Sequence, residues 1–235
     1  MMVPGSIAQW FNVFTATPQL SGGSYSTTPN WNQQTAMETI LTSKGPAGAA
    51  ASLLWLKAFG VQAVAVTRPG SKEFWGPYAD PAKFEGLLPV LWQEDGVTIY
   101  RVPQRSASLA HVVPSAYRSL EEYVAALDDP ALPIAEMSWA GFRHADIRTT
   151  ARPGQVVSVQ TAYHRGWHAT ANGRRAGVRR GGLDLLTVDT HCNGPCEIRL
   201  EYDGGWEYKL CRMLSALTLI ALIGTAAGSR HRAML

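Results

Sequence analysis

Histidine and cysteine side chains are the residues of this chain best suited to bind a metal ion. His164, His168 and His191 lie in the same stretch as Cys192 and Cys196. A structural zinc site commonly takes its four ligands as two closely spaced pairs, but no second cysteine pair follows this one, and His164 and His168 flank an expected turn. A metal site is therefore disfavoured. The sequence instead predicts a Cys192–Cys196 disulfide, closing a short loop in an oxidising compartment.

The chain lacks the familiar catalytic motifs. There is no Gly-x-Ser-x-Gly turn and no glycine-rich phosphate loop after a strand. Two pairs of adjacent carboxylates occur, but Glu94 and Asp95 are explained by a turn, and Glu121 and Glu122 by the start of a helix. The sequence therefore predicts no catalytic residue and no cofactor, and it leaves open whether the chain is the C-terminal fragment of a membrane glycosyltransferase.

Aromatic side chains are the other chemically informative group. The eight tryptophans and eight tyrosines suit both hydrophobic cores and sugar-stacking surfaces. Tyr163, Trp167 and Trp206 are the candidate stacking residues. Core packing is the default interpretation, and we expect it for Trp167, which would share the inner face of a strand with Ala169 while His168 points outward.

The basic residues do not form a continuous surface. The net charge is +3, and only Arg174, Arg175, Arg179 and Arg180 form a local cluster. Because nucleic acid binding needs a basic patch or stripe, no nucleic acid partner is expected.

The elements that must position these residues fall into two halves. In the first half the pattern predicts helices at 33–42 and 47–59, a strand at 61–67, a hairpin over 90–102, a strand at 110–113 and a short helix after Ser119. We therefore expect an aromatic-rich loop at 1–32 and a small α/β domain at 33–129.

The second half shows the alternation typical of half-buried strands. Ala145 and Ile147 alternate with charged residues, as do Ile198 and Leu200. Short strands and a turn at Asn172 predict an antiparallel β-sandwich over 134–205. The expected fold class is thus α+β, with an α/β unit followed by a sandwich.

The C-terminal stretch differs sharply in composition. Arg212 is the only charged residue in 210–228, which predicts a transmembrane helix, with a buried core helix as the alternative. Basic residues at 230–232 favour a cytoplasmic C-terminus, and the N-terminal residues resemble no secretion signal. We therefore expect a bacterial inner-membrane location, with the bulk of the chain extracytoplasmic and further membrane spans upstream.

Several segments carry a family resemblance. These are 154–156, 163–169, 172–174 and 197–202 before an apolar helix, with 56–64 and 95–103 in the first half. Together they resemble the C-terminal extracytoplasmic region of YfhO-like membrane proteins, which are similar to multi-spanning glycosyltransferases that use polyprenyl-phosphate sugars. The likeness covers most of the chain but lies mainly in turns and core positions, and the catalytic loop of such transferases has no counterpart here.

The resemblance implies a non-catalytic extracytoplasmic portion of a polytopic protein that helps form or cover a site for envelope glycan or lipid-linked sugar. Its partners would be the membrane, an upstream transmembrane domain and that glycan. In such a protein Gln19 and Trp31 could lie near the lipid-linked substrate, although a surface loop pinned by its aromatics is the alternative. The other function class that remains is a membrane-tethered carbohydrate-binding sandwich, with Tyr163, Trp167 and Trp206 as stacking faces. A soluble hydrolase is disfavoured.

Overall fold

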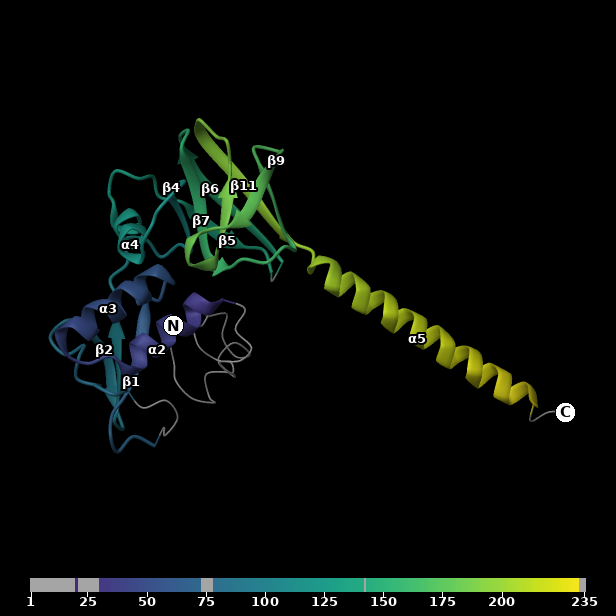
Figure 1. Ribbon diagram of the computed structural model, residues 1–235, viewed down its shortest axis with the longest axis horizontal. Coiled ribbons are helices and arrows are strands. Elements are labelled where there is room, and N and C mark those ends of the chain that lie inside the picture. Colours follow the sequence, from purple (N-terminus) through teal and green to yellow (C-terminus); the bar gives the residue numbers. More distant parts are fainter. Residues whose placement is uncertain (1–19, 21–29, 73–77, 142, 233–235) are drawn as a thin grey trace.

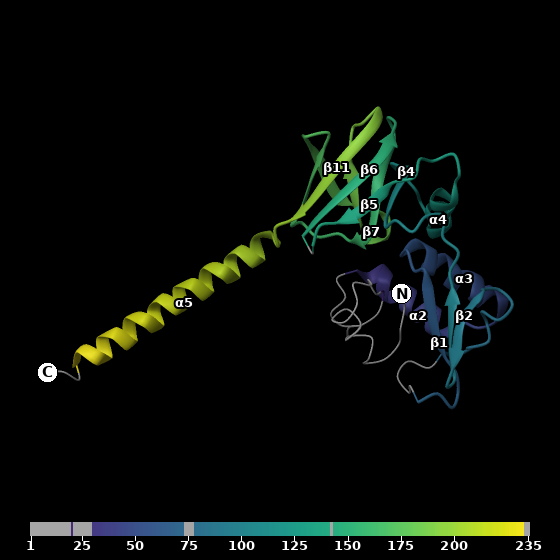
Figure 2. The same ribbon diagram turned by 180° about the vertical axis from the view of Figure 1, so that it is seen from behind.

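The computed structural model describes residues 20, 30–72, 78–141 and 143–232. A smaller N-terminal unit of helices and one sheet lies beside a larger β unit, and one long helix projects from the latter (Figure 1). The view from behind shows the same separation (Figure 2). Gln19 lies outside the described residues.

The N-terminal unit packs two helices against a three-stranded antiparallel sheet of order β1-β3-β2. Its elements are α2 (Trp31–Thr42), α3 (Gly45–Ala58), β1 (Ala63–Thr67), β2 (Val90–Glu94) and β3 (Val97–Arg101). The side chain of Asn30 caps α2 by accepting a hydrogen bond from the Gln33 backbone N–H. Asp95 and Gly96 adopt positive φ angles of 48° and 76°, as a tight hairpin turn requires.

The larger unit is one antiparallel sheet of eight strands in the order β4-β7-β10-β9-β8-β11-β6-β5. Its strands are β4 (Ala110–Pro114), β5 (Glu136–Trp139), β6 (His144–Ala151), β7 (Gln155–Ala162), β8 (Trp167–Ala171), β9 (Arg174–Arg180), β10 (Leu185–Asp189) and β11 (Gly194–Tyr202). A bridge between His111 and Ile134 brings the two ends of the sheet together. The sheet therefore curls into a nearly closed barrel.

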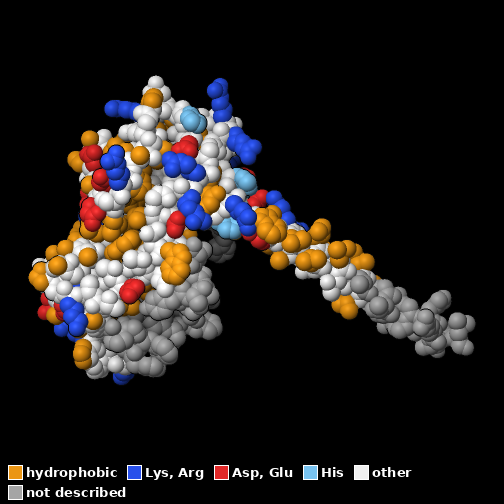
Figure 3. Space-filling view, in the orientation of Figure 1, with side chains coloured by type: hydrophobic (Ala, Val, Ile, Leu, Met, Phe, Trp, Pro, Cys, Tyr) orange, Lys and Arg blue, Asp and Glu red, His pale blue; other side chains and the backbone are white. Residues whose placement is uncertain are grey.

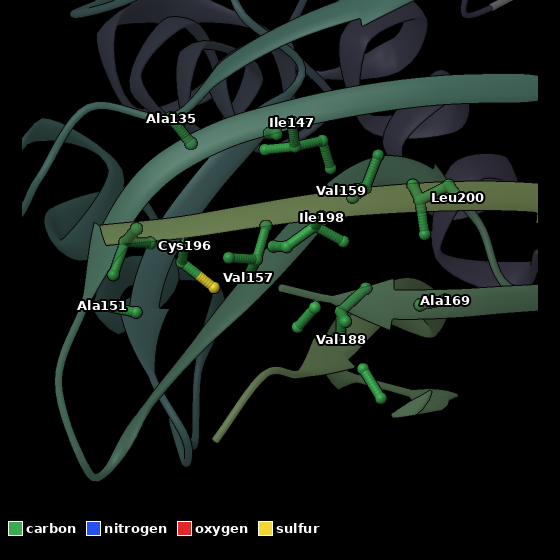
Figure 4. Close-up of a cluster of buried hydrophobic side chains, with 14 of the residues drawn as sticks. Ala135, Ile147, Ala151, Val157, Val159, Ala169, Val188, Cys196, Ile198 and Leu200 are labelled. Carbon is green, nitrogen blue, oxygen red and sulfur yellow. The ribbon is translucent and has the colours of Figure 1, made fainter. Parts of the chain in front are cut away.

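Small and branched apolar residues fill the interior of this sheet. Along β6 and β11, Ala145, Ile147, Ile198 and Leu200 are buried while their neighbours are exposed. Their side chains meet those of β7, β8 and β10 in one cluster (Figure 4). The alternation in the sequence thus gives the correct inward face for both strands.

The predicted fold class is wrong in two respects. The structure is mostly β, because the second half, together with β4 from the first half, forms a single near-barrel in place of two stacked sheets. The cause is β9, which pairs with β8 through Ala176 and with β10 from Gly177 onward. Because β9 pairs with β8 along its first part and with β10 along its second part, it joins the two expected sheets into one continuous sheet.

The second error is the transmembrane helix. The helix α5 (Gly205–Arg232) runs for 28 residues, but within the described ranges no helix combines the length and the apolar character that a membrane crossing requires. A span needs about 20 consecutive, predominantly apolar residues. Glu207, Lys209 and Arg212 interrupt the early turns of α5. Apolar side chains are exposed along the helix beyond them (Figure 3).

A buried polar network joins the two units. Helix α4 (Leu120–Asp128) packs against α3 and β4. Gln160 of β7 donates hydrogen bonds to the carbonyls of Lys57 and Ala58, at 2.9 and 3.1 Å. The Gln160 amide oxygen lies 3.1 Å from Nε2 of the buried His111.

This network predicts a pH-dependent stability. Burial lowers the pKa of His111, opposed by the hydrogen bond to Gln160 and by Asp128, while Arg105 adds to the lowering. The unfolded chain therefore takes up a proton first as the pH falls below about 6.5. The free energy of unfolding should fall there, by at most about 1.4 kcal/mol per pH unit.

Urea unfolding at pH 7.5, 6.5 and 5.5 measures this loss. His111→Gln should weaken the pH dependence, whereas His144→Gln, at an exposed position of β6, should leave it as in the wild type. Parallel curves for the wild type and His111→Gln would contradict the assignment.

Candidate binding groove

A groove opens in the large sheet where β8 and β9 separate. The two strands pair from Ala171 and Arg174 to Ala169 and Ala176, and there the ladder ends. The chain then continues as Gly177, which pairs with Asp189 of β10. Among the described residues, no backbone pairing joins Trp167 and His168 of β8 to the part of β9 that begins at Gly177.

The resulting cavity has a volume of about 690 Å³, a size typical of small-ligand sites. It is lined from β8, β9, β11 and the turn before β8 by Tyr163, Arg165, Trp167, His168, Ala169, Thr170, Arg175, Ala176, Gly177, Val178, Arg199 and Glu201.

Aromatic rings line one part of this groove. Trp167 is half-buried and packs against the barrel core. Its ring centroid lies 6.1 Å from that of Trp139 and 5.0 Å from that of Tyr202. Tyr163, also half-buried, lies under the guanidinium of Arg180 at 5.6 Å. Two aromatic side chains that line the groove are thus held in place by their neighbours.

Charged side chains form the outer rim. Arg175, Thr170 and Arg199 lie side by side across β9, β8 and β11, because Thr170 is paired with both arginines. Glu201 and His168 form the next cross-strand pair. Lys and Arg side chains are gathered on the β unit near the start of α5 (Figure 3).

The turn that precedes β8 is fastened to the base of α5. A Cβ on Gly166 would lie 2.6 Å from the backbone nitrogen of Gly205, so only glycine allows this approach. Arg165 forms an ion pair with Glu207 and lies 5.0 Å over the ring of Trp206.

Asp203 reinforces the same junction. It accepts hydrogen bonds from Lys209 at 2.6 Å and from the Gly205 backbone N–H at 2.8 Å, and His168 Nε2 lies 3.2 Å away. These donors, Lys209 foremost, hold the pKa of Asp203 well below its usual value. The carboxylate is thus ionised wherever the protein is folded at ordinary pH.

The comparisons with known proteins return nothing. No protein-family model, no curated protein and no solved structure matches the chain. The YfhO-like resemblance therefore stays a prediction from sequence.

The structure brings together two of the five predicted ligand-binding residues. Tyr163 and Trp167 both line the groove, whereas Trp206 does not line it but lies under Arg165, which does. Trp31 begins α2 in the other unit and is 74% exposed. Gln19 is outside the described residues.

Sequence reasoning missed the polar members of the groove. Arg165 and His168 lie in segment 163–169 and Arg199 in segment 197–202, which carry the family resemblance, but none of the three is predicted to bind a glycan. Arg175 is predicted only as part of an arginine cluster. Arg165 and His168 lie within two residues of Trp167 in the sequence, whereas Arg175 and Arg199 come near it only because both pair with Thr170 across the sheet. This second signal becomes usable only when the strand register is known.

The cysteines lie away from the groove, where the β10–β11 loop meets β11. Cys192 and Cys196 are joined by a disulfide, with their Cα atoms 6.0 Å apart. Asn172 fixes this loop, since it donates to the Pro195 carbonyl and accepts from the Glu197 N–H. In the part of the chain that the structure describes, no three His, Cys, Asp or Glu side chains converge as a metal site would require.

Proposed function

We propose that this chain is a non-catalytic glycan-binding module whose ligand lies in the β8–β9 groove. The observation that carries the proposal is the joint presence of Trp167, Tyr163 and a row of hydrogen-bond donors in one solvent-open cavity of about 690 Å³. Aromatic faces stack on sugar rings, while fixed polar groups orient the hydroxyls.

The lining chemistry supports binding over hydrolysis. Glycoside hydrolysis normally uses two carboxyl groups that flank the scissile bond, about 5 to 9.5 Å apart. Of the described residues that line the groove, Glu201 alone carries a carboxylate. With one carboxylate and several arginines, the groove suits recognition of a glycan.

We further propose that the module acts outside the cytoplasm, within a YfhO-like protein of the bacterial cell envelope. The sequence resemblance supports this context, and so does the Cys192–Cys196 disulfide, since such bonds persist chiefly in oxidising compartments. The ligand would then be an envelope glycan or a lipid-linked sugar.

Blocking the groove tests the proposal. Gly177 lines it at an extended strand position, and a Cβ there would meet Asp189 at an ordinary contact distance of 3.5 Å. Gly177→Ala should fold and bind glycan as the wild type does. Gly177→Leu adds a larger side chain to the groove wall, beside the Asp189–Arg179 ion pair, and should weaken binding by about tenfold or more, or about 1.4 kcal/mol.

An array of bacterial envelope glycans, followed by titration calorimetry on the hits, measures the effect. Thermal unfolding of both variants shows whether the fold is intact. A wild-type protein that binds no glycan would refute the proposed function, and a Gly177→Leu variant that binds normally would move the ligand elsewhere.

A further inference from the structure

The charged residues of the groove are unequal in sign. Three arginines, Arg165, Arg175 and Arg199, face one carboxylate, that of Glu201. A neutral sugar offers only hydroxyl groups, so it gives no electrostatic partner to a guanidinium that has no carboxylate partner within the protein. Which of the three arginines is unpaired therefore bears on the chemical class of the ligand.

Two of the three arginines are already engaged. Arg165 is paired with Glu207 and stacks over Trp206. Arg199 lies 3.4 Å from Asp146, its cross-strand neighbour on β6. The side chain of Arg175, in contrast, makes no hydrogen bond or ion pair with any residue that the structure describes.

The position of Arg175 brings it within reach of a bound sugar. It projects from the outer face of β9, beside Thr170 and two strands away from Arg199. Neighbouring strands are about 4.8 Å apart, so the two arginine backbones are separated by roughly 10 Å. Long side chains across that distance can converge on one anion, with the Thr170 hydroxyl between them as a third donor.

We propose that the groove selects glycans that carry an anionic group, and that Arg175 binds that group. This rests on the proposed glycan-binding function. The guanidinium offers two parallel N–H donors that match either a carboxylate, as in a uronic acid, or a phosphate ester. Trp167 and Tyr163 hold the adjoining sugar ring.

A matched pair of oligosaccharides tests this selectivity. The β-1,4-linked hexamers of mannuronate and of mannose share their linkage and differ by the carboxylate on each residue. The wild-type protein should bind the mannuronate hexamer about tenfold or more tightly than the mannose hexamer, and added salt should reduce the difference. A mannose hexamer phosphorylated at O6 serves as the third probe and distinguishes phosphate from carboxylate recognition.

Arg175→Gln should abolish the preference for the acidic hexamer while leaving the affinity for the neutral one within about twofold, because the aromatic contacts remain. Arg174→Gln is the matched control. Arg174 precedes Arg175 on β9, is equally exposed and does not line the groove. Neither substitution removes a buried contact, so both variants should melt as the wild type does.

Each outcome is decisive. If the wild type binds the acidic and neutral hexamers equally, or if Arg175→Gln keeps the preference, the anion selectivity is wrong while the groove remains a glycan site. If the wild type binds none of the three hexamers and no glycan of the array, the proposed function itself fails and the selectivity with it. If Arg175→Gln and Arg174→Gln both lose the preference for the acidic hexamer, the preference comes from overall charge, and the proposed role of Arg175 is wrong.

Discussion

Replacing Lys83 with methionine is expected to lower the free energy of unfolding by about 1 to 3 kcal/mol. Lys83 is only 8% exposed, and its Nζ donates hydrogen bonds to the carbonyls of Ile40 and Ser43 and to the Ser43 hydroxyl, at 2.7, 3.0 and 3.0 Å. These acceptors stand at the C-terminal end of α2, where helix carbonyls lack intrahelical partners. Methionine keeps the apolar stem but leaves them without a donor.

The same lysine gives a pH signature. Burial lowers the pKa of Lys83 from 10.5 to about 8, with Asp80 acting in the opposite direction. Between these two pH values Lys83 is protonated in the unfolded chain but deprotonated in the native state. The contribution of Lys83 to the free energy of unfolding therefore rises with pH. The difference in stability between wild type and Lys83→Met should therefore widen from pH 8 to pH 10.

Chemical unfolding of both proteins across this range measures the effect. Taking the difference between them removes the contribution of buried tyrosines such as Tyr123, whose raised pKa acts in both proteins alike. Lys72→Met is the control, since Lys72 has a side chain 90% exposed and a long ion pair with Asp95. Equal stability of Lys83→Met and Lys72→Met would show that the buried hydrogen bonds contribute nothing net.

Local patterns in the sequence predicted local structure well. The alternation around Ile147 and Ile198 identified the inward faces of β6 and β11. The Asp95 turn is where the hairpin was expected. Ser119 caps α4 by accepting from the Glu122 N–H, as the capping pattern indicated. Each of these signals depends on residues within a few positions of one another, which a single sequence displays directly.

Pairings between distant segments could not be predicted in this way. The strand containing Val112 was correctly expected, but its partner is Val157 of β7, beyond the intervening α4. The groove depends on β9 changing partners between Ala176 and Gly177. No local pattern marks that change, so the arginines that it brings to Trp167 could not be grouped from sequence alone.

The C-terminal error has a different origin. The all-round apolar character of the residues around Leu217 suggested a lipid environment. The charged early turns, where Lys209 is bound to Asp203, shorten the apolar run, and the described part of α5 does not meet the length and apolar character of a membrane crossing. Composition alone gives these charged turns too little weight.

Truncating Trp167 to alanine is expected to affect both stability and binding. Because the ring packs on the barrel core and against Trp139 and Tyr202, its removal should cost about 3 kcal/mol, toward the lower end for a buried tryptophan since the side chain is half-exposed. The same ring lines the groove, so glycan affinity should fall as well. Trp167 thus contacts the core, as the sequence predicts, and also lines the groove, as the stacking alternative requires.

Separating the two roles needs variants of graded size. Trp167→Phe should retain most of the stability, because a ring still contacts Tyr202, yet bind glycan about tenfold more weakly through loss of stacking area. Trp92→Ala is the control: Trp92 lies in β2 of the other unit, is 45% exposed and does not line the groove, so both stability and binding should change little.

Thermal unfolding and titration calorimetry on the same preparations decide between the roles, with binding measured well below the lowest melting temperature. Unchanged melting of Trp167→Ala together with lost glycan binding would contradict the structural role and make the residue a stacking platform alone. Lowered melting with full affinity in the folded protein would confine Trp167 to the core, and Tyr163 would then be the remaining aromatic side chain in the groove able to stack on the sugar.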